Sequence, residues 1–445
     1  MRSPRLAIIG DDLTGTAISA AQFANHGIQS FVFVAPPLEH NVTPAYEKVF
    51  SGQGVVGINT NTRLLDPSNA RTVVFYTVQF LVHQGYNFFV KFFDSNLRGN
   101  IAAEIGAACD ALHISRTIII PGTPQAGRVV KNGLLLINGV PIHFTHFALD
   151  PLNPIQTPNV TDIIAFSHAT IAHITISNAY FKRLLTAPAH VTSQLLFQRY
   201  IYKLWRKNNI LLFDAPNMKA IEITVANLLP LFANEKHVLI CGSLGLVTAL
   251  SNIISRSASL CDDVLLSKKR KTNKILIVSG SASSRTLQQL RLLKNIGVPI
   301  ICLDVSCLES QAYINNTAYF LNEILKAKSV AVLTSALDRA QIRKGKIALK
   351  GDLSKISVSI AEVTKKVIEN MADINELTLI VIGGLTAYNV LEKLGIKCLK
   401  IKEEKNMITY TSSYSGPYEE MQIATKGGAA GNKVALKEVI ASVMF

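Results

Sequence analysis

The chain has 445 residues, a formal net charge of +15 at pH 7, and a hydrophobic fraction of 49%. This length suggests two or three domains, and this composition supplies sizeable hydrophobic cores. The apolar runs are short and interrupted by polar residues, whereas a membrane-spanning helix needs about 20 consecutive apolar residues. The first residues lack the apolar region of a signal peptide. We therefore expect a cytoplasmic protein with no membrane partner.

Six scattered cysteines without a C-x-x-C pair indicate small core residues in a reducing compartment, and argue against disulfides or a zinc site. The positive charge is concentrated in the second half, which suits a polyanionic ligand such as a nucleotide. The basic run at residues 268–271 resembles a nucleic-acid-binding patch. No stacking-aromatic or helix-turn-helix pattern accompanies this run, so we interpret it as part of a charged linker and expect no nucleic-acid partner.

The predicted elements begin with an apolar strand at residues 6–10, followed by Asp11, Asp12 and a small-residue helix over 16–24. In an open α/β sheet, ligands bind at the carboxyl ends of the strands, so both aspartates are expected at that edge. One of them can cap the helix, and the other is then left to bind a ligand.

Strands and helices then alternate at a spacing typical of a mostly parallel sheet flanked by helices. Lys91 lies in a strand that leads straight into Asp94 and Arg98, and Arg128 lies in a long loop after another strand. A hairpin with its turn at Asn138-Gly139 is predicted over residues 133–145. The predicted strands are 30–34, 55–58, 87–93, 117–120, 211–215 and 237–242, and the predicted helices are 71–84, 101–112 and 244–254.

A polar, charged segment at residues 256–273 is the predicted linker between two α/β domains, 1–255 and 274–445. The second domain contains three Gly- or Ser-rich turns, each between a strand and a helix. Such turns offer backbone N–H groups and hydroxyls to a phosphate, and paired glycines allow close backbone approach. The predicted nucleotide-binding residues are Ser279, Ser281, Ser283, Gly383, Gly384, Leu385, Thr386, Lys426, Gly428 and Gly431. The sequence has neither a P-loop nor a G-x-G-x-x-G fingerprint, so the common nucleotide folds are not indicated.

Taken in order, these motifs resemble the four-carbon acid sugar kinases, and the resemblance spans essentially the whole chain. The matching stretches are 11–15, Lys91 with 94–100, 125–128, 150–151, 214–215, 279–281, 383–386 and 426–431. The resemblance implies an N-terminal domain that binds the acid sugar, a C-terminal domain that binds ATP, and an active site in the interdomain cleft. It also implies ATP-dependent phosphorylation of a 3-oxo-tetronate, threonate or erythronate at its terminal hydroxyl, with Mg²⁺ bridging the ATP phosphates.

Phosphoryl transfer requires positioning and charge neutralisation more than covalent chemistry by the protein. The expected catalytic residues are Asp12, Lys91 and Arg98, and the expected substrate-binding residues are Asp11, Asp94 and Arg128. An arginine, Arg98 or Arg128, is expected to bind the substrate carboxylate through two hydrogen bonds. One aspartate is expected to act as general base, and we favour Asp12 over Asp11. Lys91, Lys426 or an arginine is expected to neutralise the transferred phosphoryl group.

Three positions depart from the family pattern. The family usually has an acid where this chain has Leu385, commonly has an acid where it has Ile18, and usually has a Phe near Ala430. The change at 385 would weaken Mg·ATP or ribose binding, and the change at 18 would alter substrate preference. An inactive acid-sugar-binding relative with a regulatory or sensor role is therefore the alternative. The sequence assigns no metal ligand, no oligomeric state and no single tetronate.

Overall fold

The fold is described from a computed structural model that places residues 5–37, 43–150, 153–188, 190–233, 235–257, 272–349, 352 and 354–444. The described chain forms two compact units. The first unit comprises residues 5–11, 26–29 and 36–257, and the second comprises residues 12–25, 30–35 and 272–444. Both units are α/β structures in which helices flank a largely parallel sheet, which confirms the predicted fold class.

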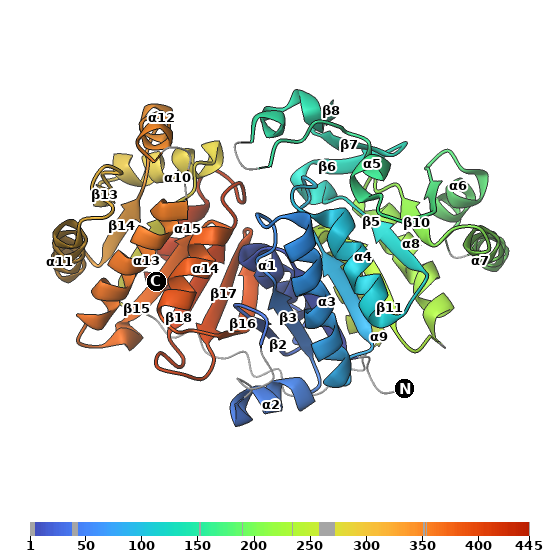
Figure 1. The fold of residues 1–445 in the computed structure, drawn as a ribbon, viewed down its shortest axis with the longest axis horizontal. Helices are drawn as coiled ribbons and strands as arrows, with labels where there is room; N and C mark the ends of the chain where they lie inside the picture. Colours follow the sequence, from blue (N-terminus) through green and yellow to red (C-terminus); the bar gives the residue numbers. More distant parts are fainter. Residues whose placement is uncertain are drawn as a thin grey trace. The chain divides into compact units, whose positions relative to one another are not determined.

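The first unit is built on seven parallel strands in the order β3–β1–β4–β11–β5–β10–β9 (Figure 1). Because the strands are parallel, their carboxyl ends and the loops that follow lie at the same edge of the sheet. Most of these strands are buried along their whole length, which explains their continuous apolar runs. Their bounds are β1 Leu6–Gly10, β3 Val55–Asn59, β4 Phe88–Phe92, β5 Thr117–Ile120, β9 Ile171–Ile174, β10 Ile210–Phe213 and β11 Val238–Gly242.

Eight α-helices accompany the first unit's sheet within the described residues. They are α2 Pro44–Ser51, α3 Pro67–His83, α4 Ile101–Leu112, α5 Val160–Ile164, α6 Ala179–Thr186, α7 Val191–Trp205, α8 Met218–Leu228 and α9 Leu244–Ser257. The predicted helix at 101–112 is reproduced residue for residue. Helices α5 to α8 and strand β9 were not predicted.

A small antiparallel sheet interrupts the alternation, formed by β6 Arg128–Lys131, β7 Leu134–Ile137 and β8 Val140–Pro141. The predicted turn at Asn138-Gly139 is confirmed. A second turn at Asn132-Gly133 adds the strand β6, which was not predicted. Both turns have positive φ at their Asn and Gly residues, as in the turns that favour Asn-Gly in hairpins.

Asp214, the residue after β10, fastens this small sheet to the parallel sheet. Its fully buried carboxylate accepts hydrogen bonds from the backbone N–H groups of Asn132 (2.8 Å), Gly133 (3.0 Å) and Ile176 (2.9 Å), and is 3.0 Å from His173 Nε2. Burial raises the pKa of Asp214, but the hydrogen bonds from His173 and the three backbone donors outweigh burial and lower it.

The next residue continues the attachment. Ala215 N donates to Val130 O over 3.0 Å, and Val130 N donates to Ala215 O over 3.2 Å. The two residues 214 and 215 thus hold β6, which begins with Arg128.

The second unit has eight strands in the order β13–β14–β12–β15–β18–β17–β16–β2. The first five strands in this order, β13, β14, β12, β15 and β18, are parallel to one another. The pairs β18–β17, β17–β16 and β16–β2 are antiparallel. The bounds are β2 Ser30–Phe33, β12 Lys274–Ser279, β13 Ile300–Cys302, β14 Val330–Thr334, β15 Leu377–Ile382, β16 Cys398–Lys405, β17 Ile408–Ser413 and β18 Gln422–Lys426. The antiparallel hairpin β16–β17 was not predicted.

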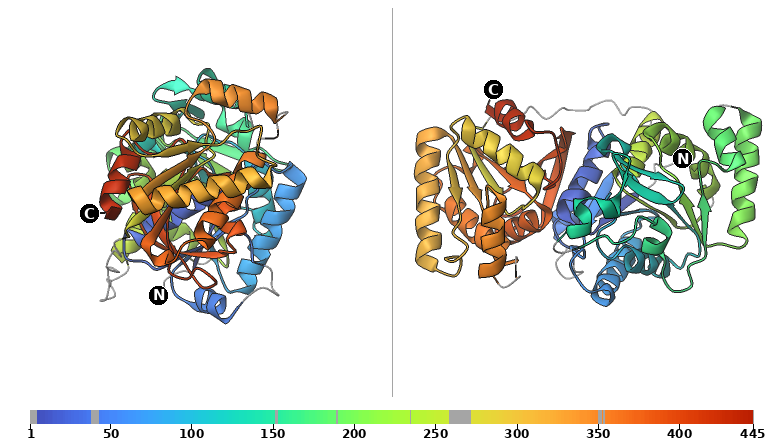
Figure 2. Two further views of the ribbon diagram at one scale, coloured as in Figure 1. Left: turned by 90° about the vertical axis from the view of Figure 1, so that its left-hand side faces the viewer. Right: turned by 90° about the horizontal axis from the view of Figure 1, so that it is seen from above.

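The helices of the second unit lie on both faces of its sheet. Figure 2 shows α10 and α15, in yellow and red, on one face, and α13 and α14, in orange, on the other. The bounds are α1 Leu13–Ala24, α10 Ser284–Asn295, α11 Gln311–Lys328, α12 Arg339–Ala348, α13 Ser354–Glu369, α14 Gly384–Lys393 and α15 Ala435–Met444.

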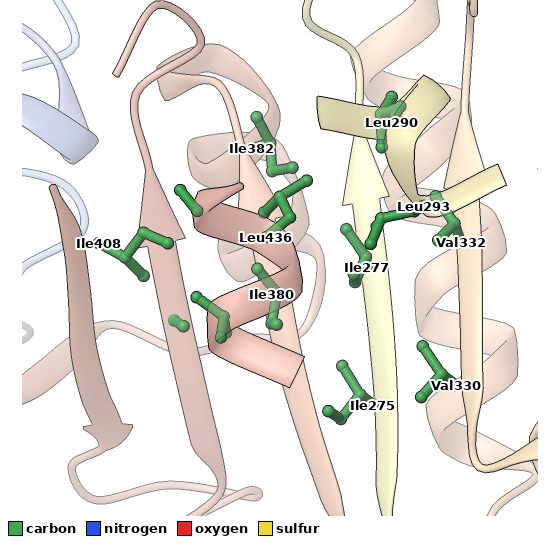
Figure 3. Packing of buried hydrophobic residues seen from close by; sticks show 13 residues of the cluster. Ile275, Ile277, Leu290, Leu293, Val330, Val332, Ile380, Ile382, Ile408 and Leu436 are labelled. Atoms are coloured by element: carbon green, nitrogen blue, oxygen red, sulfur yellow. The ribbon is translucent and has the colours of Figure 1, made fainter. Parts of the chain in front are cut away.

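The core between the sheet and helices α10 and α15 consists of large aliphatic side chains (Figure 3). Ile277 and Ile380 project from the strands toward Leu290 of α10 and Leu436 of α15, and all four are fully buried. Each such side chain stabilises the fold by about 1.5–3 kcal/mol relative to exposure. This core fixes the strands whose carboxyl ends carry the predicted nucleotide turns.

Two elements near the N-terminus belong to the second unit. Strand β2 pairs with β16, with Ser30 opposite Ile401, and α1 packs against β16, β17 and α14. The division between the units therefore falls between Asp11 and Asp12. This grouping was not predicted. The domain boundaries at 256–273 stay a prediction, since residues 258–271 lie outside the described part, as do the basic run and Cys261.

No described helix is long and apolar enough to cross a membrane. The five described cysteines are free of disulfides, and they are Cys109, Cys241, Cys302, Cys307 and Cys398.

We expect Asp214→Asn to lower the free energy of unfolding of the first unit by about 3 kcal/mol at pH 7, because hydrogen bonds to a buried charge are lost or inverted. The folded pKa of Asp214 lies below its unfolded value of 3.8. Its contribution is therefore complete above the unfolded pKa and is lost as pH falls through the folded pKa. Denaturant unfolding at pH 7 and pH 3 checks this expectation, and a variant as stable as the parent at pH 7 would contradict it. Asp162→Asn, at an exposed position of α5, is the control.

Candidate active site

The loops after β3, β1 and β4 and the first residue of β6 supply a set of charged side chains that we call the arginine cluster: Arg63, Arg98, Arg128, Asp11 and Asp94. Asp11, which follows β1, is 2% exposed. It accepts two hydrogen bonds from Arg63, from Nε over 2.7 Å and from Nη2 over 2.9 Å. Arg63 was not predicted as a site residue. The polar turn after β3 was a signal, but the sequence did not show that β3 lies beside β1.

Gly99 allows the loop after β4 to pack closely against this ion pair. Its φ is +95°, and a Cβ at this position would lie 3.2 Å from Asp11 Oδ2 and 3.3 Å from Arg63 Cγ. Both the backbone conformation and the available space therefore favour glycine.

Arg98 is held between two carboxylates. Its Nε donates to Asp94 Oδ2 over 2.5 Å, and its Nη1 donates to Asp150 Oδ2 over 3.2 Å. Its guanidinium also lies over the ring of Phe147, 5.8 Å from the ring centre. Burial opposes ionisation of Asp94, but the charges of Arg98, Arg63 and Arg128 lower its pKa well below the usual range. The predicted residues Asp94 and Arg98 therefore form an ion pair, and Asp150 is a second carboxylate partner of Arg98.

Arg128 is the arginine of the cluster whose charge is not matched by a carboxylate contact in the described part of the chain. Its Nε donates to Asn96 Oδ1 over 3.1 Å, and its Nη1 donates to Ala126 O over 2.5 Å. Burial lowers the pKa of Arg128, Asp94 raises it, and the charge of Arg98 lowers it further. Among the three arginines, Arg128 is thus the one best suited to receive the carboxylate of a ligand.

Lys91 lies in the interior of the first unit. It is fully buried, its Nζ is 2.6 Å from Glu104 Oε2, and it donates to Phe92 O over 2.8 Å. Glu104 also accepts from Thr62 Oγ1 over 2.7 Å. Burial raises the pKa of Glu104, while Lys91 counteracts that effect. The predicted role of Lys91 at the transferred phosphoryl group stays a prediction, and the observed contacts are those of a buried structural ion pair.

In the second unit, the three predicted nucleotide turns meet at the carboxyl ends of the adjacent strands β12, β15 and β18. We call residues 279–284, 383–386 and 426–431 the three-turn cluster. A Cβ on Gly280 would lie 2.6 Å from Thr386 Oγ1, and a Cβ on Gly428 would lie 2.3 Å from Ser281 Oγ. The cluster therefore brings together all the residues predicted from the three motifs, including Leu385, which is half-buried in the first turn of α14.

Two side chains of α10 tie the first turn to the last. Thr286 Oγ1 donates to Gly428 O over 2.7 Å and lies 3.3 Å from Ser281 Oγ. Gln289 Nε2, which is fully buried, donates to Asn432 O over 2.6 Å and to Ala430 O over 3.3 Å. Neither residue was predicted, because an interior helix position gives no sequence signal for contact with a turn so distant in the chain.

Asp12 lies against the three-turn cluster and caps α1. Its Oδ1 accepts from Gly15 N over 2.7 Å, and Thr14 Oγ1 lies 3.2 Å from the same oxygen. A Cβ on Gly384 would lie only 1.7 Å from Asp12 Oδ2. The carboxylate thus lies against the first turn of α14, where helical N–H groups favour negative charge. The adjacent aspartates of the sequence therefore act in different units, Asp11 with Arg63 and Asp12 with the turns.

Lys426, the last residue of β18, is 1% exposed and donates to the carbonyl oxygens of Gly427 (2.8 Å) and Gly428 (3.4 Å). Within the described ranges, no group of three or more His, Cys, Asp or Glu side chains forms a metal site. Magnesium commonly takes only one or two carboxylates and completes its shell with water and phosphate oxygens. A single carboxylate such as Asp12, beside turns suited to phosphate, fits that pattern of binding.

A groove with a volume of about 810 Å³ lies elsewhere in the first unit, along α3 and α4. Its lining includes Arg71 and Asp110, which form an exposed ion pair with each other. It contains none of the predicted site residues, so we assign the candidate chemistry to the two clusters and not to this groove.

Comparison with known families divides the chain in a similar way. A model described as a sugar-binding N-terminal domain matches residues 6–250, and a model described as a nucleotide-binding C-terminal domain matches residues 276–436. The arginine cluster falls within the first match and the three-turn cluster within the second.

Similar proteins include a D-erythronate kinase of Heliobacterium modesticaldum, 25% identical over 97% of this chain and 95% of that protein. A D-threonate kinase of Salmonella typhimurium is 31% identical over 36% of each protein. A Haemophilus influenzae protein of known structure has a similar fold, with a TM-score of 0.69, 18% identity, and coverage of 98% of this chain and 100% of that one.

We expect Gly384→Ala to destabilise the second unit by about 1–3 kcal/mol, because the new methyl group would overlap Asp12 Oδ2 and force α1 or α14 to move. Gly345→Ala in α12 is the matched control, since its Cβ would lie 3.6 Å from Val305 Cγ1, an ordinary contact. This control is expected to stabilise by about 0.5–1 kcal/mol, as Gly-to-Ala changes in helices do. Thermal unfolding of both variants compares them. Equal stabilities would show that Gly384 is not constrained by Asp12.

Proposed function

This chain belongs to the four-carbon acid sugar kinase family, and from that premise we propose that it transfers the terminal phosphoryl group of ATP to the terminal hydroxyl of a 3-oxo-tetronate, threonate or erythronate. The observation that carries the proposal is the presence of two separate clusters of complementary chemistry. One offers arginines to a small acid, and the other offers glycine- and serine-rich turns to phosphate.

The arginine cluster supports binding of an acid sugar. Arg128 has hydrogen-bond donors and contacts no carboxylate of the described residues, so it is assigned to the substrate carboxylate. Asp94 is kept ionised by its neighbouring arginines, so it remains an acceptor for sugar hydroxyls at neutral pH. Arg98 and Asp11 are already paired, and they hold the cluster in shape while presenting their remaining polar atoms.

The three-turn cluster supports binding of ATP. The N-terminus of α10 follows Ser283, and that of α14 follows Gly383, which has no side chain to cap the helix. Free N–H groups at such positions favour phosphate through hydrogen bonds and the helix dipole. Bound Mg²⁺ would neutralise phosphate charge. Asp12, which lies against the cluster, is assigned either to Mg²⁺ or to the reacting hydroxyl.

Asp12 remains the expected catalytic carboxylate. Its side chain lies against Gly384, in one of the turns assigned to the nucleotide. Its cap to Gly15 and its contact with Gly384 hold the carboxylate in one orientation, as a general base or metal ligand requires. Lys91 is proposed to act indirectly, because its ion pair with Glu104 fixes β4 and thereby the loop that carries Asp94 and Arg98.

One observation favours the second candidate, an acid-sugar-binding protein without kinase activity. Leu385 places an aliphatic side chain in the first turn of α14, next to the cluster that would hold Mg·ATP, where the family usually has an acid. Such a protein would bind the acid sugar and leave ATP unchanged.

We expect the purified chain to release ADP from ATP and Mg²⁺ with at least one of D-threonate, D-erythronate and the 3-oxo-tetronates. Asp12→Asn is expected to lower kcat by at least about 100-fold, since general-base catalysis contributes about that much, with folding retained by circular dichroism. Thermal stabilisation by an acid sugar without ADP release from any substrate would instead favour the non-catalytic candidate. In that case Leu385→Asp tests whether the missing acid is the cause.

We expect Arg128→Gln to raise KM for the acid sugar about 100-fold and to leave KM for ATP within about twofold, because charge-assisted hydrogen bonds to the substrate carboxylate are lost. The matched control is Lys131→Gln at the exposed end of the same strand, which should leave both KM values unchanged. Steady-state kinetics with each substrate varied in turn separates the effects. A rise in KM for ATP alone would contradict the assignment of Arg128.

A further inference from the structure

Lys426 is a buried lysine at the three-turn cluster without a counter-ion in the described part of the chain. It is 1% exposed, and the two acceptors within reach of its Nζ are neutral carbonyl oxygens, those of Gly427 and Gly428. By contrast, the equally buried Lys91 of the first unit has a carboxylate at 2.6 Å. An ammonium group in such a place is costly unless it loses its proton or gains an anion.

Within the part of the chain that the structure describes, the neighbouring elements place no compensating negative charge against Lys426. In the sheet, β15 and β17 place Ile382 and Ile408 opposite Lys426. Helix α10 contributes the cation Arg285. Burial, and then the charge of Arg285, lower the pKa of Lys426 to about 7.

Two acids on other elements of the second unit, Asp12 and Glu438, contact other groups. Asp12 at the start of α1 accepts from Gly15 N and lies against Gly384 of α14. Glu438 of α15 accepts from Asn406 Nδ2 over 2.7 Å. The first turn of α14 contains no acidic residue. Among the described residues, Lys426 therefore has no anionic partner.

We propose that Lys426 takes up a proton from solvent when a nucleotide binds at the three-turn cluster, so that nucleotide affinity decreases as pH rises. The inference rests on the proposed function, because it assumes that the anion that enters the cluster is a nucleotide phosphate. The step is a simple protonation: the neutral amine accepts H⁺ from the buffer, and the resulting ammonium pairs with the phosphate. No bond other than this N–H bond is made.

The direction in which nucleotide affinity changes with pH follows from the linkage between protonation of Lys426 and binding. A phosphate beside Lys426 favours the charged form, so the pKa of Lys426 is higher in the complex than in the free protein. With a free pKa of about 7, roughly one quarter of the lysine is charged at pH 7.5, and binding takes up about 0.7 proton. Between pH 7.5 and pH 9, where the phosphates of Mg·ADP are ionised, the same linkage lowers affinity about 20-fold.

Calorimetric titration of Mg·ADP into the full chain measures the uptake directly. At pH 7.5, the difference in binding heat between two buffers of different ionisation enthalpy gives the number of protons taken up. We expect about 0.7 proton for the parent and for Lys433→Met, an exposed lysine near the same turn. We expect about zero for Lys426→Arg, because arginine stays charged and needs no proton.

Two further results decide the proposal. Lys426→Met is expected to bind Mg·ADP at least about 10-fold more weakly than the parent at pH 7.5, with no uptake. Uptake below about 0.1 proton in the parent, or unchanged uptake in Lys426→Arg or Lys426→Met, would overturn the inference while leaving the proposed function intact. No binding of Mg·ADP by the folded parent at any pH from 6.5 to 9 would overturn the proposed function itself, and the inference with it.

Discussion

A charge removed from water must be matched by a counter-ion or by several hydrogen bonds, and both clusters are organised by this requirement. Lys91 is matched by Glu104, Asp11 by Arg63, and Asp94 by Arg98. Asp214 is matched by four donors. Arg128, at the start of β6, and Lys426, at the end of β18, have no carboxylate contact in the described chain. The proposed ligands, a carboxylate and a phosphate, would supply the missing negative charge at these two places.

Because the strands are parallel, they bring these charged and small residues together in two clusters. Residues that follow β3, β1 and β4 share one edge because these strands are neighbours, and residues that follow β12, β15 and β18 share another for the same reason. The adjacent residues Asp11 and Asp12 belong to different units and have different partners. One carboxylate is bound by an arginine of the first unit, while the next caps α1 in the second unit.

The packing of the three turns against their neighbours requires glycine at several positions, whether or not a ligand is bound. Side chains at positions 280, 384 and 428 would collide with Thr386, Asp12 and Ser281 respectively. The turns therefore need small residues in order to pack on one another. Once packed, they present backbone N–H groups together, which is what a phosphate site requires.

The sequence by itself determined the α/β class, most strands of the parallel sheets, and the motifs that carry the candidate chemistry, because apolar periodicity and turn composition are local properties. It also placed Asp94, Arg98 and the three turns at strand ends. Only the tertiary structure decided that Arg63 meets Asp11, that Lys91 is buried against Glu104, and that α1 and β2 join the second unit. These outcomes depend on which strands become neighbours, and strand neighbours such as β2 and β16 are set by contacts between residues far apart in the chain.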